Sequence, residues 1–81
     1  MSNTEILGQI QRILADLVSA KGMQIGTVDE STQLLGGDLP IDSLDLATLV
    51  VELEQVTGRD PFVAGFIDFR TAGELSSLYA Q

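Results

Sequence analysis

Apolar residues recur every three or four positions near the start of this chain, and this pattern constrains the fold more than any other feature. The residues are Ile6, Leu7, Ile10, Ile13, Leu14, Leu17 and Val18. A period of about 3.6 residues predicts a helix with one apolar face, over residues 3–20. Ser2 and Glu5 have capping-box spacing, with Asn3 as an alternative cap, and Gly22 is a stop signal. No segment shows the alternation typical of a strand, so we expect an all-α fold.

Residues 21–41 show no sustained period, and we expect them to form a long loop. Apolar residues punctuate this segment at Ile25, Val28, Leu34, Leu35 and Leu39. A structureless loop of this length is unusual in a small domain, so we expect it to pack across the helices. The Gly36-Gly37 pair permits a sharp turn shortly before the second helix.

A second helix is predicted to begin at Ser43 and to end at Gly58. Asp42 is a good N-cap residue, and Pro40 keeps Leu39 out of the helical region. The apolar residues of this helix form two stripes. The first, Leu46, Leu49, Val50 and Leu53, is expected to face the core. The second, Leu44, Ala47 and Val51, either contacts the long loop or is exposed for a partner.

The C-terminal third is expected to contain two shorter helices. Asp60 followed by Pro61 predicts a short helix over residues 61–67. Thr71 and Glu74 have capping-box spacing for a last helix, whose apolar side carries Leu75, Leu78 and Tyr79. The aromatic residues Phe62, Phe66 and Phe69 are expected in the core. The prediction is a single domain over residues 1–81, a small four-helix bundle with a short third helix and a long loop between helices one and two.

The charge of the chain limits its partners. Twelve acids against four bases give a formal net charge of −8. A field of this sign repels nucleic acid and anionic membranes and favours basic protein partners. No apolar run is long enough to span a membrane, and the first residues lack the basic segment of a signal peptide. We therefore expect a cytoplasmic, monomeric protein that binds other proteins. Met1 and the absence of linkers favour a free-standing chain over one cut from a larger synthase.

The residue types also limit the chemistry. The chain has neither cysteine nor histidine, which removes disulfides, the usual zinc ligands and the ordinary base at neutral pH. A nucleophilic Ser43 would lack a base, because Lys21 is poorly suited to that role. Asp42 and Asp45 are too close in sequence, at an exposed helix start, for a glycosidase pair. Asp38, Asp42 and Asp45 do not fit a calcium-loop register. The sequence therefore predicts a protein that is not an enzyme and holds no metal.

Ser43 nevertheless lies where a phosphate is favoured. Unpaired N–H groups and the helix dipole stabilise an anion at a helix N-terminus. The neighbouring acids Asp42 and Asp45 oppose this by repulsion. On these physical grounds alone, Ser43 is either a modified residue or an ordinary serine at the start of a helix.

The segment Asp38-Leu39-Pro40-Ile41-Asp42-Ser43-Leu44-Asp45 resembles the signature of the acyl carrier protein family. In that family, Asp-Ser-Leu holds the serine to which 4′-phosphopantetheine is attached. The tripeptide alone is weak, but the acidic charge, the size of the chain, the central serine and the flanking apolar helices extend the resemblance to residues 3–80. It implies a four-helix fold of acyl-carrier type with Ser43 as the attachment site.

The resemblance also implies a function. A phosphopantetheinyl transferase would load Ser43, and the thiol of the 4′-phosphopantetheine cofactor would carry an acyl or aminoacyl group as a thioester. Ligases, synthases and transferases would recognise the helix that begins at Ser43. The implied apolar contacts of this helix are Leu44, Ala47 and Val51, and the implied acidic contacts are Asp42, Asp45 and Glu52.

Some residues depart from the pattern of fatty-acid carriers. Pro40-Ile41 replaces the Gly-Ala that is common there, and Thr48 stands where an acid is frequent. These departures favour a carrier of a specialised pathway, such as polyketide or peptide synthesis. The rival hypothesis is a small acidic adaptor that docks a protein through the same helix, without covalent modification of Ser43.

Overall fold

The computed structural model describes residues 2–34, 36, 37, 39–63, 65 and 67–80. In these residues the chain forms three α-helices, α1 (Asn3–Ala20), α2 (Ser43–Thr57) and α3 (Ala72–Tyr79). The described residues contain no sheet. Their only bridge between extended residues is an isolated antiparallel one between Gln33 and Thr71. The all-α prediction and the long loop between the first two helices are therefore confirmed.

Helix α1 has the bounds that the apolar stripe predicts. The Ser2 hydroxyl accepts a hydrogen bond from the Glu5 backbone N–H at 3.2 Å, and the Glu5 carboxylate accepts one from the Ser2 N–H at 3.2 Å. These two contacts form a capping box, which satisfies donors that the first helical turn leaves unpaired. The stripe is buried along its length, at Ile6, Ile10, Ile13, Leu14 and Val18. Two residues beyond the helix, Gly22 turns the chain with φ of 76°.

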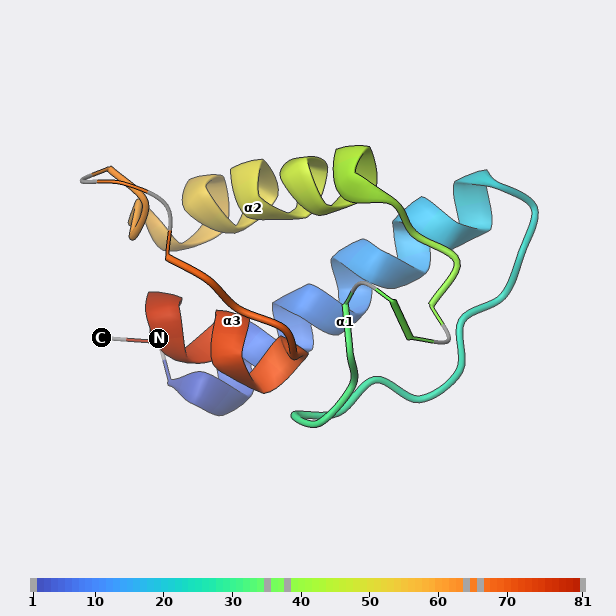
Figure 1. Cartoon of the computed structure of the whole chain (residues 1–81), viewed down its shortest axis with the longest axis horizontal. Helices are drawn as coiled ribbons and strands as arrows, with labels where there is room; N and C mark the ends of the chain where they lie inside the picture. Colours follow the sequence, from blue (N-terminus) through green and yellow to red (C-terminus); the bar gives the residue numbers. More distant parts are fainter. Residues whose placement is uncertain (1, 35, 38, 64, 66, 81) are drawn as a thin grey trace.

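Helix α1 packs against both α2 and α3 (Figure 1). The side chains of the core come from all three helices. Helix α2 contributes Leu49 and Leu53, and α3 contributes Ala72, Leu75 and Tyr79. The end of α3 lies beside the start of α1, where the Ser76 hydroxyl donates to the Asn3 side-chain oxygen at 3.1 Å. None of the helices in the described part of the chain is both long and apolar enough to cross a bilayer.

The long loop is part of the packed structure. Val28 and Leu34 are buried, as the apolar residues of this segment predict; Leu35 lies outside the described residues. Three backbone hydrogen bonds of 2.9 Å join the loop to Arg70 and to the first two residues of α3. The Leu34 N–H donates to the Arg70 carbonyl. The Ala72 N–H donates to the Thr32 carbonyl, and the Gly73 N–H donates to the Glu30 carbonyl.

The segment between α2 and α3 forms turns at Pro61, Phe62 and Val63. The Asp60 carboxylate begins these turns by accepting a hydrogen bond from the Phe62 N–H at 3.0 Å. Part of the predicted short helix over 61–67, with Ala64 and the expected core residue Phe66, lies outside the described residues. Phe62 and Phe69 are half-buried at the edge of the core, with ring centroids 5.9 Å apart.

Candidate functional site

Ser43 is the first residue of α2 and is exposed. The capping oxygen of this helix comes from Asp42, which accepts a hydrogen bond from the Asp45 N–H at 3.0 Å. The helix therefore begins where the sequence predicts. Because Asp42 is the cap, the Ser43 hydroxyl is not needed to close the first turn.

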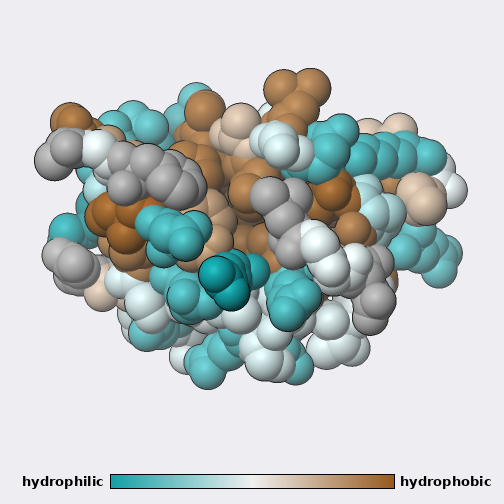
Figure 2. Space-filling model, in the orientation of Figure 1, coloured by the Kyte–Doolittle hydropathy of each residue, from teal (hydrophilic) through white to brown (hydrophobic). Residues whose placement is uncertain are grey.

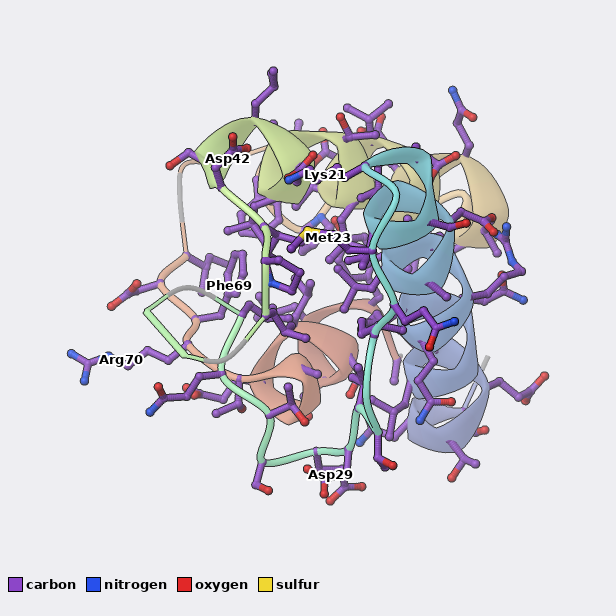
Figure 3. All side chains as sticks on the ribbon, turned by 90° about the vertical axis from the view of Figure 1, so that its right-hand side faces the viewer. Lys21, Met23, Asp29, Asp42, Phe69 and Arg70 are labelled. Atoms are coloured by element: carbon purple, nitrogen blue, oxygen red, sulfur yellow. The ribbon has the colours of Figure 1, made fainter. Side chains whose placement is uncertain are left out.

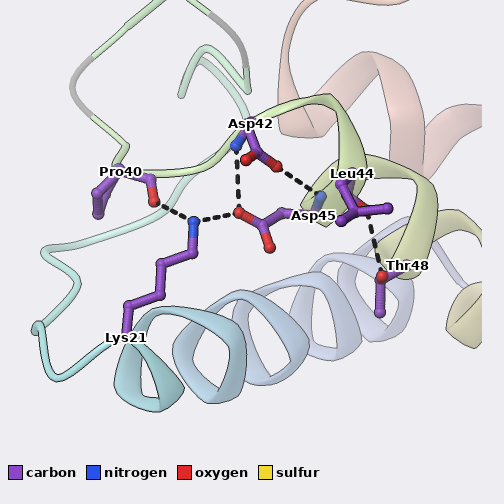
Figure 4. Close-up of polar contacts among 6 residues, drawn as sticks. All are labelled: Lys21, Pro40, Asp42, Leu44, Asp45 and Thr48. Atoms are coloured by element: carbon purple, nitrogen blue, oxygen red, sulfur yellow. Dashed lines mark hydrogen bonds and ion pairs between the residues drawn. The ribbon is translucent and has the colours of Figure 1, made fainter.

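Asp45 completes the first turn of α2 and joins it to α1 (Figure 4). Its carboxylate accepts a hydrogen bond from the Asp42 N–H at 3.2 Å, which makes a second capping box. The same carboxylate oxygen accepts from the Lys21 ammonium group, directly after α1. Lys21 also donates to the Pro40 carbonyl at 3.0 Å. The hydrogen bond from Lys21, followed by those within the capping box, holds the pKa of Asp45 below its ordinary value.

An apolar groove begins at Ser43 and runs along α2. It has a volume of about 420 Å³ and is lined by Ser43, Leu46, Ala47, Val50, Val51, Phe62 and Phe69. Helix α2 forms one wall, and the two half-buried phenylalanines form the other. Figure 2 shows hydrophobic side chains gathered over α2 and the segment beside it, with hydrophilic side chains around them. The one hydroxyl in this lining is that of Ser43, so a group attached there can enter apolar surroundings.

The second apolar stripe of α2 is exposed to solvent and does not pack against the long loop. Leu44 is 75% exposed and Val51 is 52% exposed, and Ala47 is also exposed. None of these three residues is covered by the long loop. Exposed apolar side chains grouped on one face are typical of a surface that meets another molecule.

The acidic residues that the resemblance implies as partner contacts differ in their surroundings. Asp42 is exposed, whereas Asp45 and Glu52 are half-buried. The side chain of Asp45 retains 15% exposure, because it is turned toward Lys21. Of the residues that the resemblance implies, the groove is lined by Ser43, Ala47 and Val51. It is not lined by Asp42, Leu44, Asp45 or Glu52. Asp38 lies outside the described residues.

Three residues of the site could not be assigned to it from the sequence. Lys21 is far from Asp45 in the chain, and no local pattern indicates their contact. Phe62 and Phe69 were expected in the core, but they also line the groove. Their spacing within a segment of weak periodicity gives no signal that one side of each ring faces solvent.

In the view of Figure 3, Lys21 and Asp42 lie near the top of the molecule, whereas Asp29 lies at the bottom. Within the described ranges, no three Asp or Glu side chains are grouped so that they could hold a metal ion.

Comparison of the chain with protein-family models, with curated proteins and with solved structures found no match.

Proposed function

We propose that this chain is a carrier protein of the acyl carrier family and that Ser43 is the attachment point of 4′-phosphopantetheine. The all-α globule, with its long loop before α2, is compatible with a fold of acyl-carrier type. In that arrangement, residues 61–67 would take the place of the short third helix of the family, although Pro61, Phe62 and Val63 form turns here. The protein is not itself an enzyme; it presents its cargo to enzymes of a specialised biosynthetic pathway.

One observation carries the proposal: an exposed serine that is not the helix cap lies at the mouth of an apolar groove. A serine at the start of a helix is common, and a groove beside a helix is common. Their combination gives a modifiable hydroxyl beside a surface that can contact an apolar cargo. The residues present therefore fit the proposed group.

The transfer would form a bond between the Ser43 oxygen and the phosphorus next to the pantetheine arm of coenzyme A. The pyrophosphate bond of coenzyme A breaks, adenosine bisphosphate leaves, and a base of the transferase takes the hydroxyl proton. The free N–H groups and the dipole of α2 stabilise the resulting phosphodiester. When bound, 4′-phosphopantetheine supplies the thiol that this cysteine-free chain lacks, and that thiol carries the acyl or aminoacyl group.

The exposed stripe of α2 is the proposed docking surface for the transferase and for the ligases and synthases that use the cargo. Leu44, Ala47 and Val51 provide its apolar contacts, and the net charge of −8 attracts basic partners. Docking should weaken as salt concentration rises, because salt screens exposed charges.

The test is intact mass after incubation with coenzyme A, magnesium and a broad-specificity phosphopantetheinyl transferase. We expect a gain of one phosphopantetheine in the wild type and none in Ser43→Ala. Ser19→Ala is the matched control, since Ser19 is also exposed and lies near the end of α1; it should be modified like the wild type. An unmodified wild type that circular dichroism shows to be folded, tested with several transferases, refutes the proposal.

A second candidate function is a helical adaptor that docks a protein through α2 without covalent modification. The observation that favours it is the 75% exposure of Leu44, which needs no modification to serve as a contact. The adaptor and the carrier differ in the mass experiment. An adaptor gains no mass with any transferase, but still loses its partner when Leu44 is replaced by aspartate.

A further inference from the structure

We propose that Lys21 and Asp45 form a clamp that positions Ser43, so that Asp45 acts through Lys21 and not as a direct partner contact. This inference rests on the proposed function, since it concerns presentation of the Ser43 hydroxyl to a transferase. It departs from the role that the resemblance implies for Asp45.

The first argument is the place of the Lys21 contacts along the chain. Its ammonium group donates to the Pro40 carbonyl, three residues before Ser43, and to the Asp45 carboxylate, two residues after it. One cation therefore contacts the backbone before the serine and a side chain after it. Because Lys21 directly follows α1, these contacts attach the start of α2 to the best-packed helix of the fold.

The second argument is how the Asp45 carboxylate is used. One of its oxygens accepts from both Lys21 and the Asp42 backbone N–H. The side chain retains 15% exposure, so little of it can reach a docked protein. Asp42, by contrast, is exposed and has no such tie to α1.

The third argument concerns charge. Two acids beside Ser43 oppose a phosphodiester at this position, although the helix N-terminus favours it. Lys21 offsets the charge of Asp45, which lowers that opposition. The clamp therefore fixes the position of Ser43 and reduces repulsion of the incoming phosphate. The remaining acid at the helix start, Asp42, is exposed, and its carboxylate is directed toward the Asp45 N–H and not toward Lys21 (Figure 4).

The test compares Lys21→Met and Lys21→Arg with Arg12→Met as the matched control. Arg12 also pairs with an acid, Asp16, at 3.6 Å, but on an exposed turn of α1 away from Ser43. Two measurements are made on each protein: steady-state kinetics of modification by the transferase, and amide hydrogen exchange in the first turn of α2.

We expect Lys21→Met to lower kcat of modification about fivefold with little change in KM, since misplacement of a reacting group slows the chemical step. Exchange of the Asp42 and Asp45 amides should rise by a similar factor, because their capping contacts are loosened. Lys21→Arg should restore most of both properties, and Arg12→Met should resemble the wild type. A rise in KM alone, or slower modification without faster exchange, means that Lys21 contacts the transferase directly and overturns the clamp.

A double-mutant cycle separates the effect of the position of Ser43 from the effect of the charges of Lys21 and Asp45. Lys21→Met combined with Asp45→Asn leaves three bases and eleven acids, so the net charge of −8 is kept while the clamp is removed. Because the clamp is lost in the double variant, we expect it to stay slower than the wild type, but no slower than Lys21→Met, in which Asp45 keeps an uncompensated charge. Recovery to the wild-type rate shows an effect of charge alone, and additive losses show a direct partner contact of Asp45; either result overturns the inference. An unmodified wild type refutes the carrier function, whereas the exchange data test the clamp by themselves.

Discussion

Alkaline pH is expected to destabilise this fold through a single buried side chain, Tyr79 of α3. Tyr79 is 1% exposed, its ring packs edge-on against Phe62, and its hydroxyl donates to the Val50 carbonyl of α2 at 3.4 Å. Burial, with smaller effects of Asp60 and Glu54, raises the pKa of Tyr79 from 10.0 to about 12. The cause is that a phenolate at this position would lose its hydration and face two negative charges.

The raised pKa of Tyr79 determines the sign of the pH effect on stability. The unfolded chain releases the phenol proton near pH 10 and the folded chain near pH 12, so the contribution of Tyr79 to stability is constant below about pH 10 and falls as the pH rises to 12. One pKa unit corresponds to about 1.4 kcal/mol. Since the acids near Tyr79 are exposed and screened by solvent, we expect a loss of about 2 kcal/mol. That is a large part of the stability of a small domain, which is on the order of 5 kcal/mol.

The assay is urea unfolding followed by circular dichroism, at steps from neutral pH to about pH 12. The chain has one tyrosine and no tryptophan, so tyrosinate absorbance reports the pKa of Tyr79 directly. Tyr79→Phe should remove the alkaline loss. The experiment is repeated in a Lys21→Arg background, where the charge at position 21 is retained throughout. A tyrosinate transition near pH 10 in the folded protein, or an equal loss in Tyr79→Phe, refutes the reasoning.

Three further substitutions test the packing and the proposed docking surface. Gly73→Ala would place a methyl carbon 2.7 Å from the Glu30 carbonyl oxygen; we expect about 1–3 kcal/mol of destabilisation in urea unfolding, and an unchanged midpoint would contradict the close approach. Leu53→Ala, at a fully buried position of α2, should cost about 2–5 kcal/mol, and a loss below about 1 kcal/mol would show that the core collapses around it. Leu44→Ala should change stability by less than about 0.5 kcal/mol, because Leu44 is 75% exposed. The same variant should raise KM for the transferase, and an unaltered KM would remove Leu44 from the docking surface.

The local signals in the sequence predicted α1, α2 and α3. They also predicted a helix over residues 61–67, where the described residues Pro61, Phe62 and Val63 form turns instead. The stripe of α1 and the spacing of Ser2 and Glu5 gave the observed bounds and capping box. Asp42 and Gly58 gave the start and end of α2, and Thr71 gave the cap of α3. These predictions succeed because caps and apolar faces are decided by residues three or four positions apart.

The site was predicted less completely because its contacts join distant residues. Ser43 and the exposed stripe of α2 could be named from one segment. The contact of Lys21 with Asp45, and the groove wall formed by Phe62 and Phe69, depend on how segments far apart in the chain come together. Net charge and periodicity hold no information about such pairings.

The hydrogen bonds between the long loop and the start of α3 have a consequence for folding kinetics. They pair Glu30, Thr32 and Leu34, which precede α2 in the sequence, with residues that follow α2. Contacts of such large sequence separation form slowly, since a long stretch of chain must be closed before they are gained. Helices α1 and α2 need no such closure to form their own turns.

We therefore expect α3, the shortest helix, to complete the structure last. The loop that leads into Ser43 gains its native path only once the C-terminal residues have docked. During synthesis, a nascent chain that still lacks α3 would expose the serine on an unfinished surface. In the proposed carrier, recognition by a transferase would then begin only after α3 has docked.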